Sequence, residues 1–151
     1  MYKIEPINKE IADSLKAYEL TNRAFTNIAL TFTKGNNDLK SQLDKKSIEE
    51  RTLYYVSVLD MQVLNGGIYQ FFSNYGNQYD AEIINALETI DRNEIANAFK
   101  KICTLATKEF EHVKGDYDKF DKSYYENDMS KSMDEYLKEY ILTNIEAFET
   151  K

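Results

Sequence analysis

The sequence has few of the residues that break helices or support disulfide and metal chemistry. Its 151 residues include one Pro, five Gly, one Cys, one His and no Trp. So few breakers argue against a turn-rich sandwich or barrel and favour helices. The single cysteine cannot form an internal disulfide, no signal-peptide pattern opens the chain, and no apolar run approaches the roughly 20 residues of a membrane span. These absences predict a soluble, cytoplasmic protein.

The residues that are present suffice to build a hydrophobic core. Hydrophobic residues make up 42% of the chain, with 12 Tyr and 8 Phe among them. A chain of this length buries roughly two thirds of its unfolded surface on folding. Apolar residues recur at helical steps in residues 11–32, 47–63, 80–90, 91–110 and 133–148. We predict an all-α fold, with residues 1–151 forming a single compact domain of about five to six helices.

Capping signals mark three of the predicted helix starts. Ser47 with Glu50, and Asp91 with Glu94, have the spacing of a capping box. Asp80 stands where its side chain can cap the helix that follows. Each of these residues is therefore expected to accept a backbone N–H at the start of a helix.

Two stretches interrupt the helical pattern. Asn65 and Gly66 end the helix that begins at Ser47, and a short helical segment follows over about residues 67–74. In residues 113–128 a glycine, five acidic residues and several aromatics replace the regular stripe. This composition predicts a loop or short irregular turns.

The net charge of −7 comes mostly from the last part of the chain. Residues 1–108 carry 14 acidic and 13 basic side chains, whereas residues 109–151 carry 12 acidic and 6 basic ones. An acidic field repels phosphate backbones, so we expect no direct nucleic-acid binding and favour a basic protein partner. The acids expected to bind that partner are Asp116, Asp118, Asp121, Glu126, Asp128, Asp134 and Glu135.

Residue types with catalytic or metal-binding chemistry do not gather in the sequence. His112 has no second His beside it, and Cys103 lies nine residues away, beyond hydrogen-bond reach along a helix. Asp116, Asp118 and Asp121 lack the turn glycine and closing Glu of a calcium loop. We therefore expect no catalytic residue, no cofactor and no metal.

A glycine doublet stands at the centre of a polar and aromatic motif. The motif consists of Asn65, Gly66, Gly67, Gln70, Phe71, Phe72 and Asn74. No P-loop Lys follows the doublet, so its glycines are expected to allow positive φ and a close approach of helices. The amides are expected to satisfy backbone groups and the phenylalanines to lie in the core, so the predicted role of the motif is structural.

This motif, of the form NGGxxQFFxN, resembles the signature of a bacterial family of unknown function that includes a DNA-mimic protein. The likeness extends through Ala86-Leu87, Phe120-Asp121, Tyr124-Tyr125 and residues 140–148, so it covers about residues 47–148. Gln62 stands where relatives often carry an acidic residue. The resemblance implies an all-helical single domain that can form a homodimer. In the mimic, an acidic surface imitates the phosphates of DNA and engages a DNA-binding regulator.

Three functional hypotheses follow. The leading one is a non-catalytic acidic protein that binds a DNA-binding regulator or another basic protein, as a DNA mimic does. The second is an immunity-like or antitoxin-like partner binder without mimicry, anchored by Tyr117, Tyr124 and Tyr125. The third, with the least support, is a small-ligand binder at the amides of the Asn-Gly-Gly motif, which offer no group for proton transfer.

Overall fold

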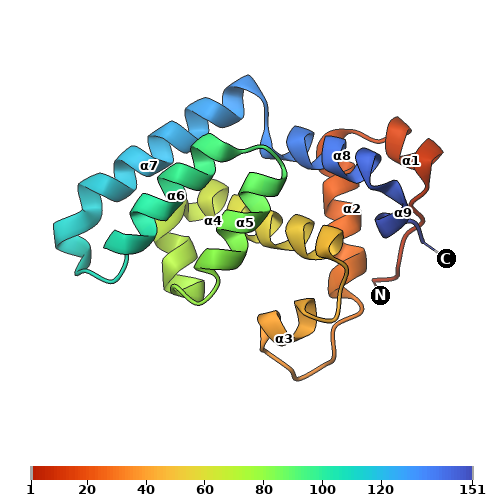
Figure 1. Ribbon diagram of the computed structural model, residues 1–151, viewed down its shortest axis with the longest axis horizontal. Coiled ribbons are helices and arrows are strands. Elements are labelled where there is room, and N and C mark those ends of the chain that lie inside the picture. Colours follow the sequence, from red (N-terminus) through yellow and green to blue (C-terminus); the bar gives the residue numbers. More distant parts are fainter. Residues whose placement is uncertain (1, 151) are drawn as a thin grey trace. The chain divides into compact units, whose positions relative to one another are not determined.

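The computed structural model describes residues 2–150, and every regular element in them is an α-helix (Figure 1). The predicted all-α fold is confirmed. The described residues form nine helices, so the expected number of five to six was too low. They are α1 Lys9–Ser14, α2 Ala17–Ala29, α3 Leu39–Leu43, α4 Ile48–Tyr75, α5 Asp80–Thr89, α6 Asn93–Leu105, α7 Phe110–Ser130, α8 Met133–Thr143 and α9 Ile145–Phe148.

The chain divides into two compact units. Unit 1 joins Met1–Tyr54 with Met133–Lys151, and unit 2 is Tyr55–Ser132. Two such units can belong to one domain, and the single domain over residues 1–151 stays a prediction. No helix in residues 2–150 is both long enough and apolar enough to cross a membrane.

In unit 1, α8 packs against α1 and α2. The α2 stripe of Leu20, Ala24 and Ile28 is buried, as are Leu137 and Ile141 of α8. The ammonium group of Lys138 donates to the Leu15 carbonyl at 2.5 Å and so satisfies a carbonyl at the C-terminal end of α1.

Two helices predicted for unit 1 are each divided in two, and a polar side chain bonds to the backbone at each interruption. Residues 11–32 were expected to form one helix, but the backbone is extended at Leu15 and Lys16, between α1 and α2. There the Glu19 carboxylate accepts the Lys16 backbone N–H at 3.0 Å. Near the C-terminus, the Asn144 side chain donates to the Tyr140 carbonyl at 2.9 Å, where α8 gives way to α9.

Unit 2 contains α5, α6, α7 and most of α4. Helix α6 packs against both α5 and α7. Its core is aromatic: the rings of Phe72 and Phe99 stack with centroids 6.0 Å apart, and Phe72 also lies 6.2 Å from the Tyr117 ring. Leu87 of α5 is fully buried in this unit.

Residues 113–128, expected to be irregular, lie inside the 21-residue helix α7, so that prediction was wrong. Val113, Tyr117, Phe120 and Tyr124 are buried and recur at helical steps. Burial of this stripe outweighs the low helix propensity of Gly115. The acids between the stripe residues hid the period in the sequence.

Of the three predicted helix starts, the capping box at Ser47 is confirmed and the caps at Asp80 and Asp91 are wrong. Ser47 and Glu50 form the expected capping box, since the Glu50 N–H donates to Ser47 Oγ at 3.1 Å and the Ser47 N–H donates to Glu50 Oε1 at 3.3 Å. Asp80 is the first residue of α5 rather than its cap. The box at Asp91 and Glu94 does not form, because Asp91 has a φ of 63° and Arg92 stands at the N-cap position of α6.

Candidate functional site

The Asn-Gly-Gly motif lies at a kink inside α4. Gly66 and Gly67 have non-helical backbone angles, and Gly67 has a φ of 78°. This is the left-handed region, which side chains other than glycine rarely adopt. A Cβ at Gly67 would also overlap the carboxylate of Asp121. The glycine is therefore required both for the turn and for the approach of α7.

Asp121 caps the second half of α4 from a distant point in the sequence. Its carboxylate accepts the backbone N–H of Ile68 at 2.8 Å, where α4 resumes after the kink. Burial raises the pKa of Asp121 above its ordinary value, the bond from Ile68 opposes that shift, and the charge of Asp118 adds to it. Asp121 is thus a structural residue of the kink.

Four side-chain amides bridge the two halves of α4. Asn65 Nδ2 donates to Gln70 Oε1 at 3.1 Å, and Gln70 Nε2 donates to Gln62 Oε1 at 2.9 Å. The same oxygen of Gln62 accepts Asn74 Nδ2 at 2.7 Å. The motif amides therefore bond to one another, rather than to the backbone groups that the sequence had suggested. Gln62 supplies an acceptor that an acidic side chain at this position could also supply.

A scan against protein-family models matches residues 44–149 to the model described as DMP19-like protein. The match covers more than two thirds of the 151 residues. The chain belongs to the DMP19-like protein family. The resemblance drawn from the motif is thereby confirmed. No curated protein and no solved structure matches the chain.

The seven acids predicted to bind a partner fall into different environments of the DMP19-like chain. Asp116, Asp118 and Glu126 are exposed on α7, whereas Asp121 is half-buried at the kink. Asp128 is half-buried near Tyr124, whose pKa its charge helps to raise. The last two belong to unit 1, in the first turn of α8, where Asp134 is half-buried and Glu135 is exposed.

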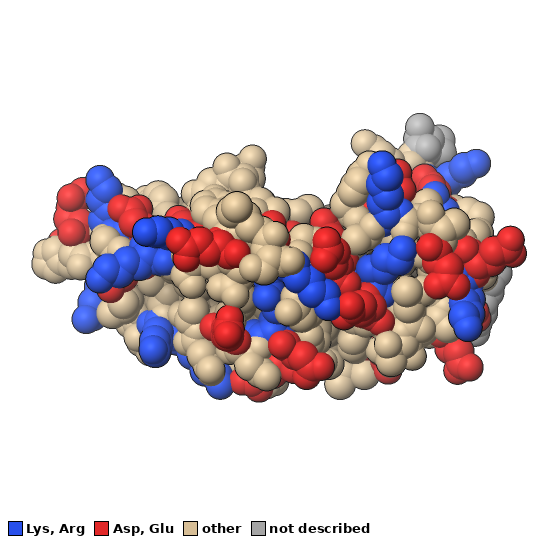
Figure 2. All heavy atoms as spheres, turned by 90° about the horizontal axis from the view of Figure 1, so that it is seen from above, with Lys and Arg blue, Asp and Glu red and all other residues tan. Residues whose placement is uncertain are grey.

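The exposed acids of α7 do not form a single acidic face. At about 100° per residue, Asp116 and Asp118 project to opposite sides of the helix. Lys114, Lys119 and Lys122 are interleaved with them and are exposed. Figure 2 likewise shows acidic and basic side chains intermixed over the face that it displays. Because acids and lysines alternate on α7, this helix does not imitate the row of phosphates along DNA.

The stronger excess of acid lies at the C-terminal end of unit 1. Residues 133–149 hold five acidic side chains and one basic one. The basic residue, Lys138, has its ammonium group bound to the carbonyls of Asp13 and Leu15. The exposed members, here called the C-terminal glutamates, are Glu135, Glu139, Glu146 and Glu149. Only Glu135 was singled out from the sequence, because the acid count of residues 109–151 did not separate α7 from α8 and α9.

The tyrosines proposed as anchors are mostly inside the DMP19-like chain. Tyr117 is 4% exposed and Tyr124 is 2% exposed, so neither can anchor a partner as predicted. Tyr124 donates to Asp60 Oδ1 at 2.5 Å, and desolvation together with the Asp60 charge raises its pKa well above the ordinary value. Tyr125 remains 40% exposed, with its hydroxyl donating to the Val63 carbonyl at 2.9 Å.

The cysteine and the histidine take no part in a shared site. Cys103 is buried, and desolvation with the nearby charge of Asp80 raises its pKa, so the thiol stays protonated. His112 is exposed on α7. Within residues 2–150, no three His, Cys, Asp or Glu side chains gather as a metal site requires.

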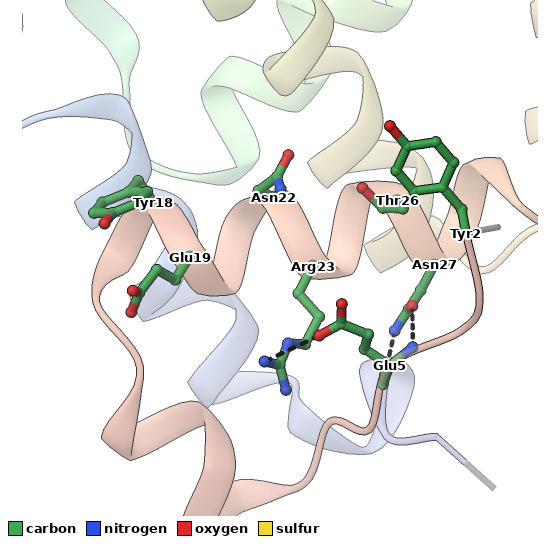
Figure 3. Close-up of a pocket in the computed structure, with 8 residues that line it drawn as sticks. All are labelled: Tyr2, Glu5, Tyr18, Glu19, Asn22, Arg23, Thr26 and Asn27. Atoms are coloured by element: carbon green, nitrogen blue, oxygen red, sulfur yellow. Dashed lines mark hydrogen bonds and ion pairs between the residues drawn. The ribbon is translucent and has the colours of Figure 1, made fainter.

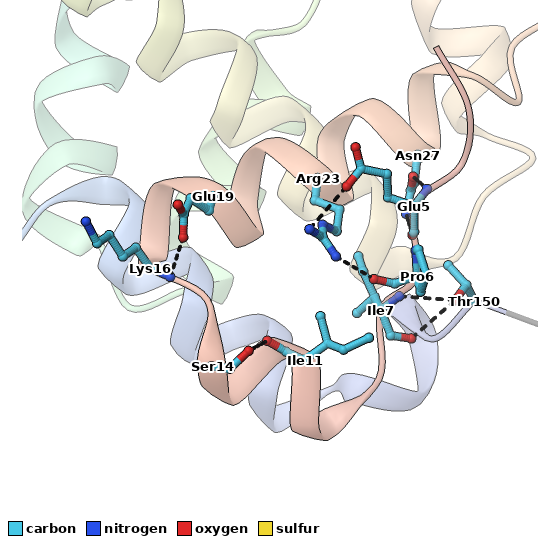
Figure 4. A network of polar contacts seen from close by, with 10 residues as sticks. All are labelled: Glu5, Pro6, Ile7, Ile11, Ser14, Lys16, Glu19, Arg23, Asn27 and Thr150. Carbon is cyan, nitrogen blue, oxygen red and sulfur yellow. Dashed lines mark hydrogen bonds and ion pairs between the residues drawn. The ribbon is translucent and has the colours of Figure 1, made fainter. Parts of the chain in front are cut away.

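A pocket of about 280 Å³ lies on unit 1, between α2 and the N-terminal segment (Figure 3). Two of its charged lining residues, Arg23 and Glu5, are already paired. Arg23 Nη2 lies 3.1 Å from Glu5 Oε2, and Arg23 Nη1 donates to the Pro6 carbonyl at 2.9 Å. The Asn27 amide bonds both backbone groups of Glu5 (Figure 4). Nearby, Thr150 N–H donates to the carbonyl of Ile7 at 3.0 Å. These contacts hold the terminal segment, and no predicted site residue lines the pocket.

Proposed function

We propose that this protein is a non-catalytic, acidic interaction protein that binds a basic, DNA-binding protein and covers the surface that this partner uses for DNA. The observation that carries the proposal is the acid excess of residues 133–149, with five carboxylates against one ammonium group. Exposed carboxylates attract a basic surface and speed its association. The chain also belongs to the DMP19-like protein family. The family that its motif resembles includes a DNA mimic, which supports the proposed binding of a DNA-binding protein.

The C-terminal glutamates lie on two consecutive helices of unit 1. Glu135 and Glu139 stand one helical turn apart on α8, and Glu146 and Glu149 follow on α9 and at its C-cap. Their only basic neighbour in residues 133–149, Lys138, is engaged with the α1 carbonyls. Within residues 133–149 a basic partner meets five carboxylates and one ammonium group.

A comparison of two neutralised variants tests the proposal. One variant carries Gln in place of each of the four C-terminal glutamates. The other carries the three substitutions Asp116→Asn, Asp118→Asn and Glu126→Gln on α7. Asp121 and Asp128 are kept in both because they are half-buried within unit 2. Each tagged protein is used to capture basic proteins from native lysate at low and at moderate salt.

We expect wild type to capture a DNA-binding protein at low salt and to lose it as salt rises, because salt screens exposed charges. The variant without the C-terminal glutamates should lose the partner already at low salt, and the α7 variant should retain it. Equal capture by the two variants and by wild type would show that these acids serve solubility alone.

The third hypothesis, a small-ligand binder at the motif, gains no support from the geometry. The amides of Asn65, Gln70 and Asn74 are engaged with each other and with Gln62. A ligand would have to displace these bonds. The second hypothesis, a partner binder without mimicry, does gain an observation: the exposed aromatic residues of unit 2 are Tyr69, Phe110 and Tyr125.

A further inference from the structure

Another pocket of unit 1, of about 200 Å³, lies where residues 4–31 meet residues 147–150 and the start of α4. The N-terminal segment is fixed in place at this point. The Ile7 N–H donates to Thr150 Oγ1 at 3.1 Å (Figure 4), and Asn27 bonds the segment to α2 through both backbone groups of Glu5. The walls of the pocket are therefore preorganised, which lowers the cost of binding a ligand there.

The lining of this pocket combines apolar walls with two carboxylates. The apolar side chains include Ile4, Ile28 and Phe148, and the carboxylates belong to Glu50 and Glu149. No lysine or arginine is among the described residues that line it, whereas the pocket on α2 contains its own paired arginine. The pocket therefore suits a ligand that is apolar along its length and positively charged at its end.

Both carboxylates keep acceptor capacity for such a ligand. Glu50 uses Oε1 for the capping box, where it accepts the Ser47 N–H and hydroxyl, and no hydrogen bond within residues 2–150 occupies Oε2. The Glu149 side chain is exposed and makes no hydrogen bond or ion pair in the same residues. An ionised carboxylate offers about four acceptor sites, so most of them are available to a cation.

The size of the pocket fits one long side chain rather than a cofactor. A cavity of about 150 Å³ accommodates benzene, and pockets for drug-sized ligands begin at about 300 Å³. Lysine and arginine are the side chains that join an apolar stem to a positive charge. The guanidinium of arginine is more weakly hydrated than the ammonium of lysine, so it loses less on entering a partly apolar pocket, and its planar fork matches a carboxylate.

We propose that this pocket binds an arginine side chain of the basic partner, with the stem against Ile28 and Phe148 and the guanidinium at Glu50 and Glu149. The inference rests on the proposed function and deepens it, because Glu149 is one of the C-terminal glutamates and the pocket adjoins them. DNA-binding proteins use arginine to contact phosphates and guanine. An arginine held in this pocket cannot contact DNA at the same time.

Titration with n-butylguanidinium, followed in amide NMR spectra of the full chain at low salt, tests the pocket without any partner. We expect saturable shifts at Ile28, Thr31 and Phe148, with a Kd on the order of millimolar. Guanidinium ion lacks the stem and n-butylurea lacks the charge, so each should bind at least about fivefold more weakly. The more strongly hydrated n-butylammonium should also bind more weakly.

Two substitutions assign this binding to the pocket. Glu50→Gln removes one carboxylate charge, keeps a residue type that can complete the capping box, and should weaken n-butylguanidinium about fivefold. Its control is Glu49→Gln, which removes the same charge one residue away, at a side chain that is not among the described lining residues. Ala147→Leu fills the pocket and should abolish the saturable shifts, with Ala29→Leu on α2 as its control. Circular dichroism verifies that each variant is folded.

Capture of the basic partner provides the second measurement. Ala147→Leu retains all four C-terminal glutamates but should lower capture at least about fivefold, whereas Ala29→Leu should capture the partner as wild type does. The inference is overturned if n-butylguanidinium binds no more tightly than n-butylurea or n-butylammonium. It is also overturned if Glu49→Gln weakens binding as much as Glu50→Gln, or if Ala147→Leu captures the partner fully.

These outcomes leave the proposed function intact, because that function is tested by the variants of the exposed acids. Failure of the proposed function has a different appearance: wild type captures no basic protein at low salt. That result would overturn both proposals, since it removes the protein that supplies the arginine.

Discussion

Replacing Asp121 by Ala removes the carboxylate that accepts the Ile68 backbone N–H at 2.8 Å. Ile68 is fully buried and Asp121 is half-buried, so the lost acceptor lies only partly within reach of water. Loss of a helix cap costs about 1 kcal/mol, and a buried N–H without a partner costs about 1–3 kcal/mol. We expect Asp121→Ala to lower the free energy of unfolding by about 1–3 kcal/mol.

Urea unfolding followed by circular dichroism measures this change, with Asp118→Ala as the matched control. Asp118 stands three residues earlier on the same helix and is exposed, so its removal should change stability by about 0.5 kcal/mol or less. Equal stability of Asp121→Ala and Asp118→Ala would refute the role of Asp121 as the cap of the kink.

The variant Asp121→Asn separates the hydrogen bond from the charge. Its amide oxygen can still accept the Ile68 N–H, and it carries no charge to bury. Burial raises the pKa of Asp121 above 3.8, so its contribution favours the folded state at acid pH and is lost as pH rises through the folded pKa. Stability of wild type relative to Asp121→Asn should therefore increase between pH 7 and about pH 4. A relative decrease over this interval would contradict the burial of the carboxylate.

Four further substitutions test the account by thermal or urea unfolding. Gly67→Ala should destabilise by about 2 kcal/mol or more, because φ is 78° and the new Cβ overlaps a carboxylate, whereas Gly115→Ala on α7 meets nothing within 4 Å and should stabilise by about 0.5–1 kcal/mol. Tyr124→Phe deprives Asp60 of its 2.5 Å donor and should cost about 1–3 kcal/mol; a neutral result would mean that the bond is dispensable. Ser47→Ala should cost about 1 kcal/mol through loss of the α4 cap, and an unchanged midpoint would contradict that role.

Local signals in the sequence were enough to place the kink. The doublet of Gly66 and Gly67 marked the interruption of α4, and Ser47 with Glu50 marked its start. Both features depend on backbone conformation and on hydrogen bonds within a few residues. Such features are encoded by the residue types themselves.

Features that depend on distant contacts were not visible in the sequence. Asp121 was taken for a partner-binding acid, whereas it bonds to Ile68, 53 residues away. Helix α7 was missed because its buried stripe is diluted by charged residues, and the environments of Tyr117 and Tyr124 followed from that error. In each case, contacts between elements far apart in the chain determine where the residue lies. The hydrophobic periodicity of a single sequence does not show such contacts.

The most direct test of the proposed function is competition between the captured partner and DNA. The protein is immobilised, its salt-sensitive basic partner is bound, and a short DNA duplex is added at increasing concentration. If the C-terminal glutamates cover the DNA-binding surface of the partner, the duplex should release the partner in proportion to its affinity for DNA. A partner that stays bound while it also binds the duplex would contradict the proposal.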